Sequence, residues 1–206
     1  AMAPRGRALL PPLLLLAGAA AGDRCESALP FTLHGVDGGG FLKGSAGTAA
    51  GDRLALEHNG GVTFFSACAE EWEAESIGQL KLLGHELSFV VDLNRVGCAC
   101  NLAVYLTSMP ARGFNGEFSR GENRGTQPPY YCDANMLGGQ WCPEVDLMEA
   151  NDHVFQATLH NCEPPQNGHY NYCDRVGCSE STRQSQGSYG PGGQHLIDTR
   201  RPFRVR

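Results

Sequence analysis

Short runs of β-type residues alternate with clusters of turn-forming residues along most of the chain after position 61. In the segment 86–92, Leu87, Phe89 and Val91 recur at every second position, which places them on one face of a half-buried strand. Such runs, bounded by Gly, Pro, Asn and Asp, are typical of strands. The pattern predicts strands at 62–66, 86–92, 102–108, 144–147 and 154–159.

The rest of the chain carries weaker or different signals. No long stretch has helical periodicity, and the segment 69–83 is compatible with either a helix or a strand. Residues 23–60 are Gly-rich and indicate little beyond two turns. The chain has 27 Gly and 12 Pro, which suits an all-β fold with many turns. We therefore expect a β-sandwich or jelly roll with long loops. The two turns are expected at 37–40 and 59–61, and polar Gly/Pro-rich loops at 111–130 and 163–195.

The first 22 residues have the composition of a secretory signal peptide. Arg5 and Arg7 form a basic start, an apolar run covers 9–16, and small residues fill 17–22. A membrane anchor or a buried strand is the alternative, but the run is too short to cross a bilayer, which takes about 20 apolar residues. We expect a signal peptide at 1–22, a single domain at 23–206 and a secreted, extracellular protein.

The net charge of the chain indicates which kinds of macromolecule it can bind. The chain has 16 basic and 22 acidic residues, and loss of residues 1–22 would remove two arginines and no acid. The expected mature chain would thus carry 14 basic and 22 acidic residues, a formal charge of −8. Such a surface repels phosphate backbones, so nucleic acid is not expected as a partner. A neutral polysaccharide carries no charge, so this surface does not repel it.

The segment 144–149 concentrates three acidic residues in one β-type run. On a regular strand Glu144 and Asp146 lie on the same face, and Val145 and Leu147 face the core. Glu149 is five positions from Glu144, so strict alternation would place it on the wrong face.

One extra residue in the strand, a β-bulge near Leu147 or Met148, would correct that parity. All three acids would then line one cleft. Retaining glycoside hydrolysis needs such a pair of carboxyl groups, one ionised and one protonated, about 5–5.5 Å apart. A third acid would help to set their protonation. The alternatives are a solvated acidic strand or a calcium site.

Several ordered motifs resemble glycoside hydrolase family 7. The segment Glu144-Val-Asp146-Leu-Met-Glu149-Ala-Asn151 resembles the family signature Glu-x-Asp-x-x-Glu-Ala-Asn. Further motifs follow at compatible spacings, and the resemblance covers roughly residues 77–206 with gaps. These motifs lie at 82–92, 98–109, 131–133, 160–162, 173–178, 188–192 and 196–199.

The resemblance implies a concanavalin-like jelly-roll sandwich and a cellulase that hydrolyses β-1,4-glucosidic bonds with retention. It covers the N-terminal half of the family's domain, so we expect a fragment or reduced form whose sandwich is incomplete. It implies that Glu144 is the nucleophile, Glu149 the general acid/base and Asp146 the assisting acid. Positions that match the glycone side of the cleft, or flank the acid/base, are Asn101, Tyr105, Tyr131, Asp133, Asn135 and His160.

Each of these polar residues also has a structural interpretation, since a lone Tyr or His is more often part of the packing. Two other function classes stay open. One is a non-catalytic carbohydrate-binding protein derived from the hydrolase, and the other is a jelly-roll glucanase with a different linkage specificity. The expected partner is cellulose or another β-glucan, and we expect a monomer with no cofactor, no metal and no membrane contact.

The chain has nine cysteines, which after a signal peptide indicates disulfides. The resemblance implies the pairs Cys132–Cys142 and Cys162–Cys173. A second family disulfide beside the first one is absent, because its positions hold Met136 and Trp141. The partners that the family gives to Cys98 and Cys178 lie outside this chain. Cys25, Cys68 and Cys100 stay unassigned, with Cys25–Cys68 one open pairing and a zinc site the competing interpretation.

Overall fold

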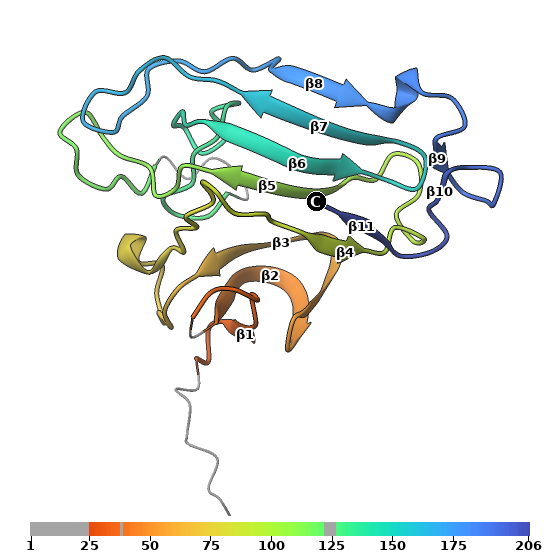
Figure 1. The fold of residues 1–206 in the computed structure, drawn as a ribbon. Coiled ribbons are helices and arrows are strands. Elements are labelled where there is room, and N and C mark those ends of the chain that lie inside the picture. Colours follow the sequence, from red (N-terminus) through yellow and green to blue (C-terminus); the bar gives the residue numbers. More distant parts are fainter. Residues whose placement is uncertain (1–24, 38, 122–126) are drawn as a thin grey trace, which may run out of the picture.

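The computed structural model describes residues 25–37, 39–121 and 127–206 (Figure 1). The expected signal peptide lies outside the described residues. Among the described residues, no helix has both the length and the apolar character needed to cross a membrane. The regular structure consists of strands and two short 3₁₀ turns, η1 at Ala74–Ser76 and η2 at Thr182–Gln184.

The strands form two larger sheets and two small pairs. In the first sheet the antiparallel order is β1–β2–β3, and in the second it is β5–β6–β7–β8. β4 pairs with β11, and β9 pairs with β10 in parallel. The strands are β1 (Leu29–Phe31), β2 (Gly40–Ala50), β3 (Arg53–Phe65), β4 (Phe89–Val91), β5 (Leu102–Thr107), β6 (Glu144–Ala150), β7 (Phe155–His160), β8 (Cys178–Ser181), β9 (Tyr189–Gly190), β10 (Ile197–Asp198) and β11 (Phe203–Val205).

One face of the β5–β8 sheet packs on the small β4–β11 pair (Figure 1). β4 and β11 come from distant parts of the sequence, and Val91 lies opposite Phe203 in their register. Their apolar side chains meet alternate residues of β5 and β6, with Met148 fully buried at the centre. The β4–β11 pair and the β5–β8 sheet thus form two layers. The face of the β5–β8 sheet that points away from this core carries polar residues.

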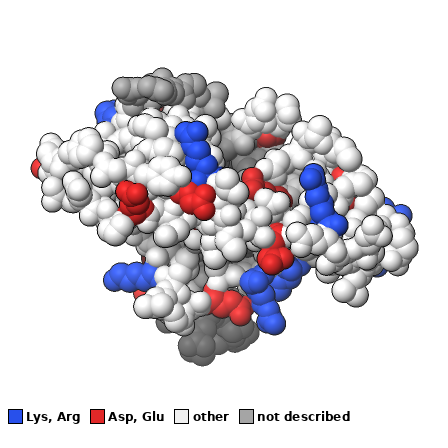
Figure 2. All heavy atoms as spheres, turned by 90° about the horizontal axis from the view of Figure 1, so that it is seen from above, with Lys and Arg blue, Asp and Glu red and all other residues white. Residues whose placement is uncertain are grey.

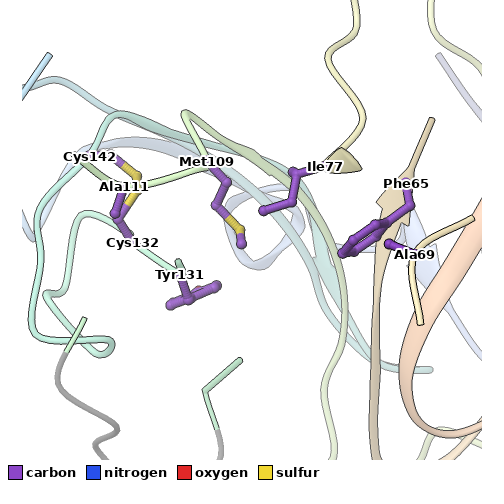
Figure 3. Packing of buried hydrophobic residues seen from close by; sticks show 8 residues of the cluster. All are labelled: Phe65, Ala69, Ile77, Met109, Ala111, Tyr131, Cys132 and Cys142. Atoms are coloured by element: carbon purple, nitrogen blue, oxygen red, sulfur yellow. A yellow bond between two sulfur atoms is a disulfide. The ribbon is translucent and has the colours of Figure 1, made fainter. Parts of the chain in front are cut away.

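A second core cluster joins the β1–β3 sheet to the loops beside β5 and β6 (Figure 3). It runs from Phe65 on β3 through Ile77 and Met109 to the disulfide of Cys132 and Cys142. Because all of these side chains are buried, the cluster fixes the loop that enters β6. Both cores therefore hold β6 in place, one behind the strand and one at its start.

The structure confirms most of the predicted strands and corrects their bounds. The strand predicted at 86–92 is limited to β4, although its alternation of burial extends from Leu87 to Leu93. The strand predicted at 144–147 continues to Ala150. The undecided segment 69–83 contains only η1, and the predicted loop 163–195 contains β8, η2 and β9.

The turn predicted at 59–61 is wrong, because these residues lie inside β3. The β2–β3 hairpin is hard to predict from the sequence, since β2 is rich in Gly and Ala and β3 is interrupted by Gly60 and Gly61. Gly44 lies opposite Val62 in the register of the hairpin, and a Cβ on Gly44 would clash with the backbone of Gly61 and Val62. The glycines therefore serve a close approach of two strands rather than a turn.

Charged side chains of both signs are interspersed over the face seen in Figure 2. Most of the surface in this view is uncharged, so the net charge of −6 does not translate into one continuous acidic field there. The acids that matter for the site are instead distinguished by burial. Glu144 and Asp146 are each only 7% exposed.

Candidate active site

The predicted β-bulge is present in β6. Tyr105 of β5 lies opposite Asp146, but the next pair along is Val104 with Met148, so β5 has no partner for Leu147. The pairing with β7 shifts in the same part of the strand, between Asp146 and Glu149. The extra residue changes the parity of the strand, and Glu149 follows Glu144 and Asp146 onto one face.

The bulge also changes which apolar residue enters the core. Val145 and Leu147 were expected to face it, but both are half-buried and belong to neither core cluster. Met148 and Ala150 enter the core instead, because the residues after the bulge have exchanged faces. The expectation for Leu147 is therefore wrong, since this residue is itself the bulge.

The three acids line one pocket of about 380 Å³ on the polar face of the β5–β8 sheet. Each strand contributes alternate residues, Ala103 and Tyr105 from β5 and Gln156, Thr158 and His160 from β7. Loops close the rest of the pocket. Its other lining residues are Gln127, Tyr131, Asp133, Asn135, Leu137, Arg175 and Val176.

The Glu144 carboxyl group is held by the loop that precedes β6. Its Oε2 accepts a hydrogen bond from the backbone N–H of Ala134 at 3.0 Å. Burial raises the pKa of Glu144 to about 7, against the Ala134 hydrogen bond, and the carboxylates of Asp146 and Asp133 add to the rise. The group therefore exchanges its proton near neutral pH.

Asp146 lies between the two glutamates and is bonded to a histidine. His160 Nε2 lies 3.1 Å from Asp146 Oδ2, and His160 Nδ1 lies 2.8 Å from the carbonyl oxygen of Asp174. Since a carbonyl only accepts, Nδ1 carries a proton, and one further proton must lie between Nε2 and Asp146. Burial raises the pKa of Asp146, partly offset by His160. Burial opposes protonation of His160, but the Asp174 and Asp146 contacts raise its pKa overall.

Glu149 has a different environment from Glu144. It is half-buried, and its Oε1 accepts a hydrogen bond from Asn101 Nδ2 at 3.3 Å. Asn101 lies outside the main pocket, in a neighbouring hollow of about 200 Å³ that shares Glu149 and Gln156 with it. Asn101 is thus placed to orient Glu149.

Asp133 lines the pocket but is used mainly by its own loop. It is 1% exposed, and its Oδ1 accepts hydrogen bonds from the N–H groups of Asn135 and Leu137, both at 2.9 Å. This arrangement shapes the turn that presents Ala134 to Glu144. Tyr131 donates its hydroxyl to that of Tyr105 at 3.5 Å, and burial raises the pKa of both phenols.

The structure brings eight of the nine predicted site residues into one pocket, and Asn101 into the adjoining hollow. Sequence reasoning missed Gln156 and Thr158, although both share the parity of His160 on β7 and could have been found by alternation. Arg175 and Val176 lie in a loop, and no local pattern indicated that this loop returns to the pocket.

Three disulfides cross-link the described residues. Cys132–Cys142 and Cys162–Cys173 are the pairs that the resemblance implies, and Cys25–Cys68 is the pairing that had stayed open. Cys98, Cys100 and Cys178 are free and exposed. Within the described ranges, one group of three side chains could approach a metal ion, Cys25, Cys68 and Glu70, but its two sulfur atoms are joined to each other.

Comparisons with known proteins confirm the resemblance over part of the chain. Residues 69–138 match the model of glycosyl hydrolase family 7. Endoglucanase type C of Fusarium oxysporum is 27% identical over 208 residues, which cover 89% of this chain and 48% of that protein. Endoglucanase EG-1 of Hypocrea jecorina is 32% identical over 142 residues, which cover 61% of this chain and 28% of that protein. The chain thus spans less than half the length of these relatives.

Solved structures give the same result for the fold. A structure described as endoglucanase I complexed with cellobiose matches with a TM-score of 0.58 and 26% identity, over 77% of this chain and 46% of that chain. A glycosynthase mutant of a Humicola insolens enzyme matches with a TM-score of 0.57 over the same shares, at 23% identity. These matches confirm the predicted all-β jelly-roll sandwich, of which the chain provides a part similar to glycosyl hydrolase family 7.

Proposed function

We propose that this chain carries the acid-bearing sheet of a secreted, retaining hydrolase of β-1,4-glucosidic bonds in cellulose or related glucans. The observation that supports it most directly is the bulge at Leu147, which brings Glu144, Asp146 and Glu149 to one pocket. The similarity to endoglucanases of several fungi and to a cellobiose-bound endoglucanase structure supports the substrate class. The three disulfides fit an oxidising compartment.

In the first step, the Glu144 carboxylate attacks the anomeric carbon of the sugar. The bond to the leaving oxygen breaks while the Glu149 carboxylic acid donates its proton to that oxygen. A covalent ester between Glu144 and the sugar results, and the shortened glucan leaves with the proton.

In the second step, the Glu149 carboxylate takes a proton from water, and the water oxygen attacks the same carbon. Glu144 departs as a carboxylate and Glu149 is again an acid, so the two steps regenerate the enzyme. The anomeric configuration is inverted twice and therefore retained.

The neighbouring residues have separate tasks in this scheme. Ala134 N–H orients Glu144, and Asp146 shares a proton with His160. Asn101 orients Glu149. Tyr105, Tyr131, Asn135 and Asp133 line the wall along which sugar rings would lie, where aromatic faces and hydrogen-bonding groups are suited to bind them.

The proposal is tested with the full chain on a chromogenic cellobioside. We expect Glu144→Gln to abolish turnover, because an amide cannot form the ester. Glu149→Gln should lower turnover by roughly 10²–10⁴-fold when the leaving group needs a proton, and by less for an acidic phenol that leaves unaided. Glu180→Gln, on the exposed strand β8, is the matched control and should retain full activity.

Normal turnover by Glu144→Gln would remove the assignment of the nucleophile. Binding of cellulose by the wild-type chain with no turnover of any substrate would identify a binding protein instead. A preference for β-1,3 over β-1,4 glucans would retain the chemistry and overturn the substrate.

A further inference from the structure

Arg175 reaches the pocket from the loop between Cys173 and Cys178 and is fixed there by two contacts. Its guanidinium carbon lies 5.0 Å from the centre of the Trp141 ring, and its Nη2 donates a hydrogen bond to the carbonyl oxygen of Asn135 at 3.2 Å. A guanidinium over an indole face is a favourable cation–π arrangement. The side chain is thus oriented although it lies on the surface.

Trp141 is itself held in a defined position. It forms single β-bridges with Asp133 and with Tyr170, directly before the cysteine that precedes the acidic strand. Its ring centre lies 5.7 Å from that of Tyr172, which is 53% exposed. The side chains of Arg175, Trp141 and Tyr172 therefore form one contiguous group, of which Arg175 lines the pocket.

This group occupies a position where the resemblance implies a disulfide instead. Trp141 and Met136 stand at the two positions of that absent second pair. The substitution exchanges a covalent link for an aromatic ring that supports an arginine. The arrangement is therefore a property of this chain and not one that the family pattern supplies.

The hydrogen-bonding capacity of Arg175 is largely unused. A guanidinium has five N–H donors, and one of them bonds to Asn135. Although four carboxylates line the same pocket, Arg175 forms no ion pair with any of them among the described residues. The Trp141 ring and the Asn135 carbonyl hold the guanidinium, and its remaining donors have no partner among the described residues, so they are available to a ligand.

The pocket that Arg175 lines also has apolar, exposed side chains. Leu137 and Val176 both line the pocket and are 52% and 84% exposed. Donors and apolar side chains in one pocket suit a pyranose ring, which has hydroxyl groups at its rim and C–H groups on its faces. A sugar acid fits less well, because the carboxylates of the pocket would repel it.

We propose that Arg175, held by Trp141, is a specificity-determining residue that binds the hydroxyl groups of a neutral β-linked glucosyl unit over Leu137 and Val176. This inference rests on the proposed function, since it assumes that a glucan chain occupies the pocket. It adds that affinity depends on chain length, because only a glucan long enough to extend from the acids to this end of the pocket contacts Arg175.

The test uses the full chain carrying Glu144→Gln, so that ligands bind without turnover. Cello-oligosaccharides from two to five glucose units are titrated by calorimetry into this variant and into versions that also carry Arg175→Ala, Arg175→Lys or Trp141→Phe. We expect Arg175→Ala to weaken binding of the longer ligands about tenfold, the value of one hydrogen bond to a charged group, and to leave the shortest unaffected. Arg175→Lys should restore little, since an ammonium lacks the planar fork. Arg201→Ala, an exposed arginine outside both pockets, is the matched control.

Fluorescence provides an independent measurement. The chain has two tryptophans, Trp72 and Trp141, and Trp72→Phe leaves Trp141 as the single reporter. Longer ligands should change its emission, and the shortest should not. If the chain hydrolyses and binds glucans but Arg175→Ala behaves as its parent at every length, this inference is wrong and the proposed function stands. If the wild-type chain neither binds nor hydrolyses any glucan, the proposed function fails, and this inference fails with it.

Discussion

Burial of two carboxyl groups in one pocket makes their protonation the main variable at the level of single residues. Glu144 and Asp146 are both buried, which raises the pKa of each, and the Asp133 carboxylate adds to the rise at both. The Ala134 N–H and the His160 ring act in the opposite sense. The balance leaves Glu144 with a pKa of about 7, so the proposed nucleophile, which must be ionised to attack, is only partly ionised at neutral pH. Binding of a sugar would have to favour the charged form for rapid attack.

This shifted pKa predicts how stability depends on pH. A carboxyl group whose pKa is higher in the folded state binds more protons when folded, so stability falls as pH rises through the interval between the two values. For Glu144 the interval runs from its ordinary value of 4.5 to about 7. The wild-type chain should lose up to about 3 kcal/mol of unfolding free energy across it.

Glu144→Gln should remove most of that loss, because the amide has no proton to release. The measurement is urea unfolding at a series of pH values, with Glu180→Gln as the control for an exposed glutamate. Equal slopes for the wild type and Glu144→Gln between pH 4.5 and 7 would show that Glu144 titrates normally and is not buried as described.

At the level of elements, three of the four strands in the sheet that carries the acids could be predicted, whereas β8 and most of the β1–β3 sheet could not. β5, β6 and β7 have clear β-type runs, and the parity of Glu149 required a bulge that the structure has. β2 and most of β3 were missed, and only the end of β3 was predicted, as the strand at 62–66. The close approach of the two strands depends on glycines without side chains, which leave no hydrophobic pattern. The positions of the loops that carry Asn135 and Arg175 could not be predicted from local sequence patterns, because contacts between distant segments determine them.

The close approach of β2 and β3 gives a prediction with an internal control. A Cβ on Gly44 would meet the carbonyl of Gly61 and the backbone of Val62, whereas a Cβ on Gly61 would meet no atom within 4 Å. Gly44→Ala should therefore force the strands apart and destabilise the chain by roughly 1–3 kcal/mol.

Gly61→Ala places the same methyl group on the opposite strand of the hairpin and should change the unfolding free energy by less than about 0.5 kcal/mol. Thermal and urea unfolding of both variants provide the comparison. Equal destabilisation by the two substitutions would mean that strand propensity alone, and not contact between the backbones, determines their effect.

For the whole molecule, two separate hydrophobic cores hold the strand that carries the three acids, β6. The cluster around Met148 packs behind β6, with β4 and β11 supplied from positions more than 100 residues apart in the chain. The cluster from Phe65 to Cys142 packs at the start of the strand. The pocket is therefore placed by long-range contacts, while the identity of its acids is already evident in a segment of six residues. The chain provides this pocket within less than half the length of the endoglucanases that it resembles.

The central claim is that the bulged strand presents Glu144 as a nucleophile opposite Glu149. Trapping of the covalent intermediate with a 2-deoxy-2-fluoro-cellobioside that has a good leaving group, followed by mass spectrometry of peptides, tests it most directly. We predict a single sugar adduct on Glu144, which is absent in Glu144→Gln and released when water or an acceptor sugar completes the second step. An adduct on another residue, or hydrolysis that inverts the anomeric configuration without any adduct, would contradict the account.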